Sequence, residues 1–235
     1  MHLFYTPRAQ KGIFTLDSSE SAHCTRVLRL ETGDSISVTD GKGKMMKARI
    51  IKPDKKACVA EIVEIRNTPP ERDFSVQIAI APTKNIDRFE WFLEKSVEIG
   101  VDRIIPLLCR NSERRSIKHE RLSKVMIAAM KQSLSAWLPQ ITPLVAFDDF
   151  VAESYDGTKL IATVSADIAS NPGKLYKPGN DALILIGPEG DFSNTEMDLA
   201  IKNGFLPVSL SNKRLRTETA GLVACHSVNF LNDLR

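Results

Sequence analysis

The chain has 235 residues, of which 43% are hydrophobic and 26% are charged, a composition typical of a folded soluble protein with a sizeable core. No apolar stretch approaches the roughly 20 residues that a membrane-spanning helix needs. The first residues, MHLFYTPRAQKG, also lack a basic region followed by an apolar run, so they do not indicate a secretion signal. We therefore expect a cytoplasmic protein with no membrane partner.

The cysteines argue against a metal centre. Cys24, Cys58, Cys109 and Cys225 lie far apart, with no C-x-x-C pair and no histidine at metal-ligand spacing. This pattern also argues against a disulfide scaffold. We expect buried free thiols and no bound metal.

The opening 70 residues are typical of a small β-barrel. Short strand patterns broken by turn residues occupy 2–5, 12–16, 35–40, 44–52 and 56–65, and a helix is expected from Ser18 to Leu30. This part holds 12 Lys and Arg against 8 Asp and Glu, whereas the remainder holds 20 against 21. The basic excess favours contact with a polyanion, although a solvated charged surface explains it equally well.

Residues 66–73, RNTPPERD, form the best domain boundary in the chain because consecutive prolines make a stiff polar linker. Two domains are expected, 1–70 and 71–235. In the second, strand patterns at 74–81, 103–108, 159–164, 182–187 and 206–210 alternate with helix patterns at 86–100, 120–134, 194–204 and 217–234. This alternation predicts an α/β domain with a mostly parallel sheet covered by helices on both faces.

A Gly-Pro-Glu-Gly turn, 187–190, directly follows one of these strands. Ligands bind at the carboxyl ends of strands in such sheets, so the turn is a binding-site candidate. It lacks the Lys of a Walker loop and the G-x-G-x-x-G of a dinucleotide site, and Glu189 disfavours an anionic ligand. Gly187 and Gly190 tolerate positive φ and permit close backbone approach, so the turn favours a neutral or cationic ligand.

A second turn of the same kind precedes the last helix. Residues 211–216, SNKRLR, are strongly basic, yet Leu215 among them must bury against something. Thr217 can cap the final helix, whose N-terminus then faces the same cleft. Ser193 and Glu196 form a capping box for the helix after the first turn.

Several short segments, taken together, match a known pattern. The turn at 187–190 is followed some twenty residues later by LSNKRLRTETA (210–220), and the chain also contains HCTRVLR (23–29), KSVEIG (95–100), NSERR (111–115) and AAMKQS (128–133). In this order they resemble the RsmE-type branch of the SPOUT methyltransferases. Two positions depart from the family pattern: Asp191, where a second glycine often stands, and Lys131, where an acidic residue is common.

The resemblance implies an S-adenosylmethionine-dependent enzyme that methylates N3 of a uridine in 16S ribosomal RNA of the small ribosomal subunit. It also implies a PUA-like barrel followed by a SPOUT domain, with a trefoil knot at roughly 160–235 that pattern alone would never justify. Such folds are usually homodimers, and Leu222, Val223, Val228, Phe230 and Leu231 are candidates for the interface or the core.

Residue roles follow from the same resemblance. The cofactor-binding candidates are Thr163, Leu185, Gly187, Gly190, Leu210, Ser211, Leu215 and Thr217. Arg216 is the candidate for stabilising a uracil anion, and Glu218 or Glu189 for accepting the proton. The RNA-binding candidates are His23, Arg26, Arg29, Arg110, Arg114 and Arg115.

Two other readings stay open at this point. The chain is then either a nucleotide-dependent α/β enzyme acting on a small metabolite, or a non-catalytic RNA-binding factor in ribosome assembly. Binding of S-adenosylmethionine rather than NAD or ATP separates the first of these from methyl transfer, and transfer of a methyl group to RNA separates the second.

Overall fold

A computed structural model describes residues 2–9, 12–70, 72–164 and 170–235. The chain divides into two compact units. Residues 1–71 and 127–138 form the first unit, and residues 72–126 and 139–235 form the second. The sequence pattern predicts a single domain boundary near the prolines 69 and 70. It does not predict that residues 127–138 belong to the first unit.

The first unit is built on a five-stranded sheet with the order β1-β3-β4-β5-β2. Its strands are β1 (Leu3–Tyr5), β2 (Ile13–Thr15), β3 (Ser35–Thr39), β4 (Lys44–Lys52) and β5 (Val59–Asn67). Register shifts between β4 and β5 accommodate curvature, so the sheet curls around a core that includes Phe4, Leu16, Val38, Ile50 and Cys58. All five strand patterns of the sequence are therefore present in a half-barrel.

The helix of the first unit differs from the prediction. Asp17 caps α1 (Ser18–Ala22) by accepting a hydrogen bond from the Glu20 N–H at 2.8 Å, and α1 ends well before Leu30. The chain then continues as a π-helix (His23–Val27) that ends before Leu30. Arg29 has a φ of 55°, and this left-handed residue terminates the helical segment.

The segment 127–138 joins the first unit through backbone hydrogen bonds. The Gly43 N–H donates to the Ala136 carbonyl at 2.9 Å, and the Leu138 N–H donates to the Gly41 carbonyl at 2.9 Å. Gly43 has a φ of 92°, and a Cβ there would meet the Trp137 ring at 2.4 Å, so only glycine fits this approach.

The second unit contains a seven-stranded sheet whose main order is β12-β10-β11-β6-β7-β8, with β9 pairing with β7. The strands are β6 (Val76–Ile80), β7 (Arg103–Leu108), β8 (Gln140–Ile141), β9 (Val145–Ala146), β10 (Thr158–Ala162), β11 (Ala182–Ile186) and β12 (Leu206–Val208). Every pairing is parallel, as the alternation of strands and helices predicts.

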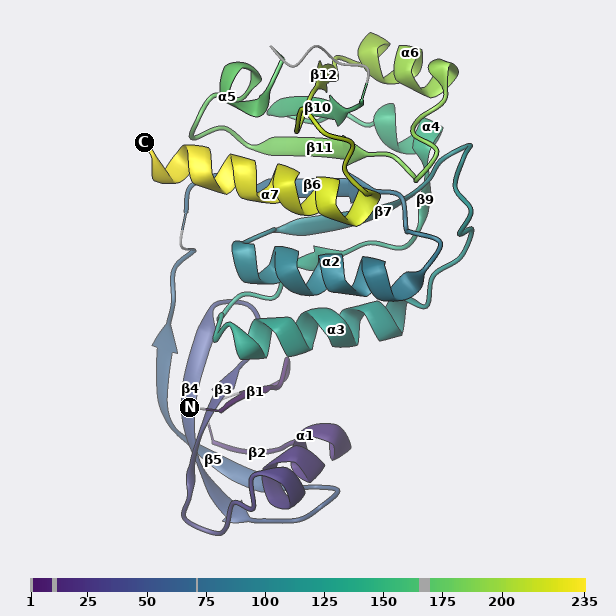
Figure 1. Cartoon of the computed structure of the whole chain (residues 1–235). Helices are drawn as coiled ribbons and strands as arrows, with labels where there is room; N and C mark the ends of the chain where they lie inside the picture. The colour runs from purple at the N-terminus through teal and green to yellow at the C-terminus, as the bar shows by residue number, and fades with distance from the viewer. Residues whose placement is uncertain (1, 10–11, 71, 165–169) are drawn as a thin grey trace. The chain divides into compact units, whose positions relative to one another are not determined.

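Helices cover both faces of this sheet (Figure 1). On one face, α2 (Ile86–Ile99) and α7 (Thr217–Asp233) pack together over β6 and β11, and α5 (Pro172–Leu175) packs against α7. On the other face, α4 (Phe147–Val151) and α6 (Asn194–Lys202) enclose a core with Ala79, Leu183 and Leu185. The helix α3 (His119–Gln132) runs from the second unit into the first.

Local sequence explains the ends of these helices. Gly100 ends α2 in the left-handed region with a φ of 104°, and Ser193 and Glu196 form the predicted capping box of α6. The two-residue strands β8 and β9 and the short helices α4 and α5 were not predicted, because segments this short carry no periodic pattern. The region of the predicted knot supplies β10, α5, β11, α6, β12 and α7, and its residues 165–169 lie outside the described residues.

Candidate functional site

The site lies where three neighbouring strands of the second unit end. In the sheet, β10 stands between β12 and β11, and the last residue of β10, Ala162, pairs with both Ile186 of β11 and Val208 of β12. The segments that follow the three strands therefore start at the same level of the sheet. The chain reverses its strand order here, which is where open α/β sheets bind ligands.

A cavity of about 310 Å³ opens at this edge of the sheet, and its size falls within the range of small-molecule sites. The residues after β10, β11 and β12 and the first turn of α7 form its walls, together with one residue of α2. Its lining consists of Arg88, Ala162, Thr163, Val164, Ile186, Gly187, Pro188, Glu189, Asp191, Ser209, Leu210, Ser211, Lys213, Arg214, Leu215, Arg216, Thr217, Glu218 and Ala220.

The Gly-Pro-Glu-Gly turn forms one wall of the cavity. The Asp191 N–H closes the turn by donating to the Pro188 carbonyl at 2.9 Å. A Cβ on Gly187 would lie 3.1 Å from the Phe192 ring and 3.2 Å from its backbone nitrogen, so a side chain there would crowd the turn. Neither Gly187 nor Gly190 uses its tolerance of positive φ, and the left-handed residue of the turn is Asp191, with a φ of 61°.

Two neighbouring segments hold this turn in place. The Asn111 side-chain amide donates to the Asp191 carbonyl at 3.0 Å and more weakly to the Gly190 carbonyl at 3.4 Å. From the loop before α2, the Lys84 N–H donates to Glu189 Oε1 at 2.9 Å. That loop is itself fixed by the guanidinium of Arg114, which donates to the carbonyls of Thr83 and Lys84 at 2.9 and 2.6 Å.

The opposite wall is the basic turn and the start of α7. Leu215 is half-buried against the cavity, which accounts for an apolar residue in so basic a stretch. The predicted cap was wrong by one residue: Arg216 occupies the N-cap position, without a side-chain cap bond, and Thr217 is the first residue of α7. Glu218 is buried in the first turn, with its Oε1 4.0 Å from Nε of Arg88.

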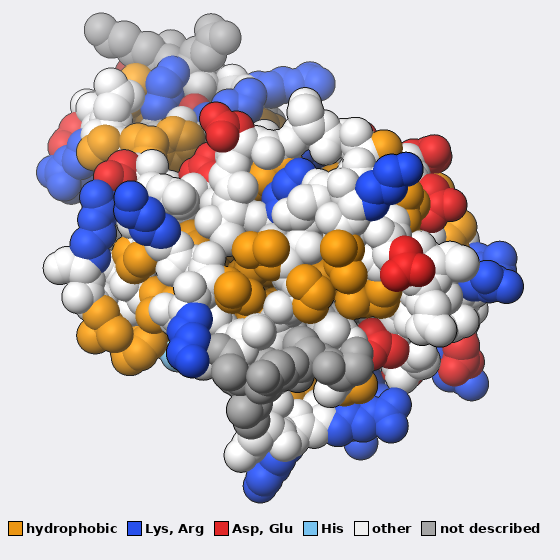
Figure 2. All heavy atoms as spheres, turned by 90° about the horizontal axis from the view of Figure 1, so that it is seen from above, with side chains coloured by type: hydrophobic (Ala, Val, Ile, Leu, Met, Phe, Trp, Pro, Cys, Tyr) orange, Lys and Arg blue, Asp and Glu red, His pale blue; other side chains and the backbone are white. Residues whose placement is uncertain are grey.

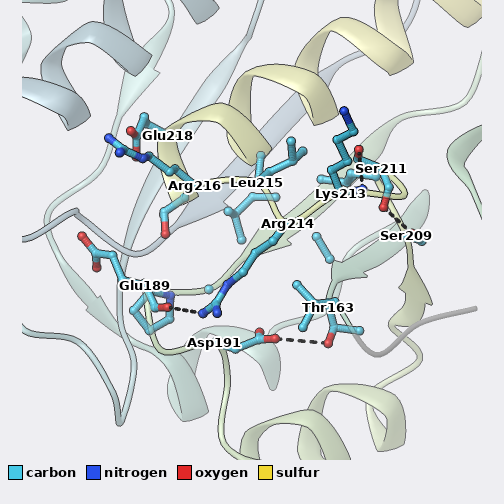
Figure 3. Close-up of a pocket in the computed structure, with 18 of the residues that line it drawn as sticks. Thr163, Glu189, Asp191, Ser209, Ser211, Lys213, Arg214, Leu215, Arg216 and Glu218 are labelled. Atoms are coloured by element: carbon cyan, nitrogen blue, oxygen red, sulfur yellow. Dashed lines mark hydrogen bonds between the residues drawn. The ribbon is translucent and has the colours of Figure 1, made fainter. Parts of the chain in front are cut away.

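Charged side chains of both signs face the cavity (Figure 3). The Arg214 side chain extends across it, and its guanidinium donates to the Glu189 carbonyl at 3.4 Å. Asp191 points its carboxylate toward Thr163, whose hydroxyl donates to Oδ2 at 3.4 Å. This wall therefore offers peptide groups and a carboxylate instead of the ring of N–H donors that a phosphate requires.

The structure brings most of the predicted site residues together. Six of the eight cofactor candidates line the cavity, as do all three catalytic candidates. The other two lie beside it. Leu185 is fully buried in the core under α4 and α6, and Gly190 sits on the outer side of the turn, where a Cβ would lie 3.5 Å from Asn111.

The RNA-binding candidates are divided between the two units. His23 and Arg26 lie on the π-helix of the first unit, and Arg29 follows it. In the second unit, Arg110 and Arg115 are exposed, whereas the guanidinium of Arg114 is engaged by backbone carbonyls. Figure 2 shows lysine and arginine side chains scattered over the face it presents, with no single basic patch.

The predicted site residues omitted four charged residues of the lining, of which Lys213 and Arg214 belong to the recognised basic turn and Arg88 and Asp191 lie outside both turns. Arg88 reaches it from α2, about a hundred residues away in sequence, and no motif marks it. Asp191 stands directly after the recognised turn, and its contribution depends on a left-handed backbone that a residue pattern does not reveal.

Among the described residues, no group of His, Cys, Asp and Glu is arranged to hold a metal, and no helix has the length and apolarity to cross a membrane. All four cysteines are buried and free, as expected.

Comparisons with known families agree with this architecture. Residues 70–229 match the family described as RNA methyltransferase domain, and residues 16–63 match the RNA methyltransferase PUA domain. Ribosomal RNA small subunit methyltransferase E of Synechocystis is 32% identical over 224 residues, which cover 92% of this chain and 73% of the relative. The protein of the same name from Bacillus subtilis is 26% identical, with 94% and 91% covered.

Solved structures extend the likeness to the whole fold. A probable rRNA methyltransferase from Porphyromonas gingivalis is 43% identical, with a TM-score of 0.92 over 100% of this chain and 99% of that one. Ribosomal RNA small subunit methyltransferase E from Neisseria gonorrhoeae, crystallised with bound S-adenosyl methionine, is 29% identical, with a TM-score of 0.89 over 98% of both chains. The predicted fold class is confirmed in its α/β methyltransferase unit of the SPOUT type, with a parallel sheet, and in the PUA-like unit that precedes it, whereas the trefoil knot stays a prediction.

Proposed function

The chain belongs to the RNA methyltransferase family that includes ribosomal RNA small subunit methyltransferase E, and we propose that it transfers a methyl group from S-adenosylmethionine to N3 of a uridine in 16S ribosomal RNA. The observation that carries this proposal is the cavity at the ends of β10, β11 and β12. It unites the Gly-Pro-Glu-Gly turn, the basic turn and the RTETA start of α7 in a single site. A relative with this fold holds S-adenosyl methionine in its crystal structure.

The cavity suits the chemistry of that methyl donor. Adenine and ribose are neutral and polar, so backbone groups after the three strands are suitable partners for them. Gly187 leaves room for Phe192 in the turn, and Leu210 and Leu215 supply apolar contacts to the cavity. We assign direct contact with the cofactor to the candidates that line the cavity: Thr163, Gly187, Leu210, Ser211, Leu215 and Thr217. Leu185 and Gly190 do not line it, and we assign to them the support of the lining residues.

The bound donor supplies an electrophilic methyl carbon on a positively charged sulfur. Uracil N3 must lose its imide proton as the N–C bond forms, because the neutral imide nitrogen is a poor nucleophile. We assign to Arg216, which is exposed at the N-cap of α7 and lines the cavity, the stabilisation of negative charge on a uracil carbonyl. The proton then passes to Glu218 or Glu189, the carboxylates of the two cavity walls, directly or through water.

The substrate RNA needs a second region of contact. In the first unit, His23, Arg26 and Arg29 form one candidate surface. In the second unit, Arg110 and Arg115 form another, whereas Arg114 beside them is held by the Thr83 and Lys84 carbonyls and supports the loop. Phosphate contacts of this kind give salt-dependent affinity with little sequence choice, so we propose that the target uridine is selected by flipping into the cavity and by RNA shape.

Three further assignments complete the proposal. The enzyme works in the cytoplasm, where small ribosomal subunits are assembled, and it needs no metal. It acts as a homodimer, which the exposed apolar side chains of Phe230 on the last helix and Leu234 at its C-cap favour. Val228 is removed from the interface candidates because it is buried in the monomer. Sedimentation equilibrium at several protein concentrations tests the dimer.

The direct test of the proposed activity uses small ribosomal subunits that lack the modification. The protein is incubated with these subunits and methyl-labelled S-adenosylmethionine, and the RNA is digested and analysed by mass spectrometry. We expect label in N3-methyluridine at one position of 16S RNA. Donor binding without transfer to RNA would instead favour the assembly-factor hypothesis, and stabilisation by NAD or ATP alone would favour a metabolic enzyme.

A further inference from the structure

Asp191 occupies a backbone position that normally favours glycine. Its φ of 61° lies in the left-handed region, which L-residues other than Asn and Asp rarely adopt. Residues held in such conformations cluster at functional sites, where the surrounding structure keeps them in place. Here the turn bond to Pro188 and the Asn111 amide hold the backbone of Asp191.

Two donors orient the carboxylate of Asp191. One oxygen, Oδ1, accepts the Phe192 N–H at 2.8 Å, and the other, Oδ2, accepts the Thr163 hydroxyl at 3.4 Å. The side chain is half-buried and lines the cavity. The carboxylate is therefore fixed at the wall between the ends of β10 and β11.

The other carboxylate of the turn is placed differently. Glu189 is exposed, accepts the Lys84 N–H, and points its carboxylate away from Thr163 (Figure 3). Asp191 instead points toward Thr163 across the cavity wall. Of the two acidic residues after β11, Asp191 is the better placed to meet a ligand.

The carboxylate of Asp191 has no ionic partner among the described residues. No Lys, Arg or His nitrogen of the described part of the chain lies within 4.0 Å of it, the distance that defines an ion pair. The methionine end of S-adenosylmethionine carries one positive and one negative group that balance each other. Its sulfonium is the unbalanced charge of the molecule, and a carboxylate without a basic partner complements it.

On the proposed function, which this inference presupposes, we propose that Asp191 is the counter-charge for the sulfonium of the methyl donor and so determines the preference for the donor over its demethylated product. When the methyl group leaves, the electron pair of the broken S–C bond stays on sulfur, which becomes a neutral thioether. The attraction to Asp191 is then lost, and the product is released more readily. Asp191 strengthens donor binding, while Arg216 acts on the reacting uracil.

The test compares two ligands that differ by the methyl group and the charge on sulfur. Dissociation constants of S-adenosylmethionine and S-adenosylhomocysteine are measured by calorimetry for the wild type, Asp191→Asn, Asp191→Gly and Glu189→Gln. Asn preserves the shape and tolerates the left-handed backbone, and Gly removes any backbone strain at this position. Asp198→Asn, an exposed carboxylate on α6, controls for the change in net charge.

We expect both Asp191 variants to bind the sulfonium ligand about tenfold more weakly while their affinity for the thioether changes less than about twofold, because a charge pair at a partly exposed site contributes on this scale. Asp198→Asn should leave both affinities unchanged. Equal losses for the two ligands would overturn the proposal, as would a selective loss in Glu189→Gln with none in the Asp191 variants. If the wild type binds neither ligand, the proposed function itself fails, which is a different result.

Discussion

The two units differ in how closely a buried carboxylate is paired with its cation. In the first unit, Glu20 and Lys131 face each other at 2.5 Å, with 9% and 21% of their side chains exposed. Burial raises the pKa of the Glu20 carboxyl, and the hydrogen bond from Lys131 opposes this rise. In the second unit, Glu218 is equally buried but lies 4.0 Å from its cation, Arg88, and both line a cavity.

On the proposed function, this difference separates charges that stabilise the fold from charges that act on a ligand. A buried pair in direct contact neutralises its two charges and ties together segments distant in sequence. Charges held apart at a cavity wall stay free to interact with a substrate, and perturbed or loosely paired groups of this kind cluster at functional sites. The comparison also explains the departure at Lys131, because this cation has its counter-charge in Glu20.

Replacing Arg216 tests the functional side of the comparison and carries the largest expected effect. We expect Arg216→Ala to lower turnover about 100- to 1,000-fold, the usual loss on removal of one charge-stabilising donor. Affinity for S-adenosylmethionine should change less than about threefold. Single-turnover methylation and calorimetry measure the two quantities, and an unchanged rate with intact donor binding would remove Arg216 from the mechanism.

Gly221 tests how much the close packing of α7 against α2 and β6 contributes to the stability of the second unit. A Cβ at this position would lie 2.7 Å from the Phe92 ring and 2.8 Å from Ile80. We expect Gly221→Ala to lower the free energy of unfolding by about 2 kcal/mol, as overpacking typically does. Urea denaturation measures this loss. In a Phe92→Leu background the loss should be smaller, and an equal loss in both backgrounds would argue against the contact as its cause.

Lys131→Met tests the structural side of the comparison. It leaves a buried carboxylate without its cation, and because Lys131 is partly exposed we expect a loss of about 2 kcal/mol at pH 7, below the range for fully buried pairs. Lys124→Met on the same helix, whose pair with Glu120 is exposed, should cost less than about 0.5 kcal/mol.

The loss in Lys131→Met should also depend on pH. The folded state raises the pKa of Glu20, so it binds a proton more tightly than the unfolded state does. Stability from this group is present at low pH and is lost as pH rises through the raised pKa. The penalty in Lys131→Met should therefore shrink as pH falls from 7 toward 5, and urea denaturation at several pH values measures it. A penalty that grew on acidification would contradict this account.

The smallest expected effects are those of replacing Arg114 and Arg115, two neighbouring arginines of which we expect one to stabilise a loop and the other to contact RNA. Arg114 holds the loop at Thr83 and Lys84, so Arg114→Ala should cost about 1 kcal/mol of stability, the worth of a typical hydrogen bond. Arg115 is exposed, so Arg115→Ala should leave stability unchanged but weaken RNA binding about threefold at low salt and reduce its salt slope by about one. Thermal unfolding and filter binding check the pair. Identical behaviour of the two variants would refute the distinction.

The sequence indicated the fold wherever its pattern was long. Apolar runs such as 182–187 and the stripe of α2 predicted most strands and helices, because they are the surfaces that the core requires. The strands β8 and β9, which have two residues each, carry no such pattern. The membership of 127–138 in the first unit depends on long-range packing around Trp137, which no local pattern encodes.

The candidate site was predictable only where motif residues follow strands in register. The ends of β10, β11 and β12 bring Thr163, Gly187 and Leu210 to one cavity. Motifs marked the segments after β11 and β12, whereas Thr163 was predicted from the family resemblance alone. Arg88 was missed because it comes from a helix on another part of the sheet. Asp191 was noted as a departure, but its place in the cavity depends on a left-handed backbone.

The central claim is that the cavity after β10, β11 and β12 binds the methyl donor. Calorimetric titration with S-adenosylmethionine of the wild type, Ser211→Trp and Asn212→Trp tests it most directly, because Ser211 lines the cavity while its exposed neighbour Asn212 does not. We predict one site per chain in the wild type and in Asn212→Trp, and at least tenfold weaker binding in Ser211→Trp. No heat of binding in the wild type, or equal binding by both tryptophan variants, would contradict the claim.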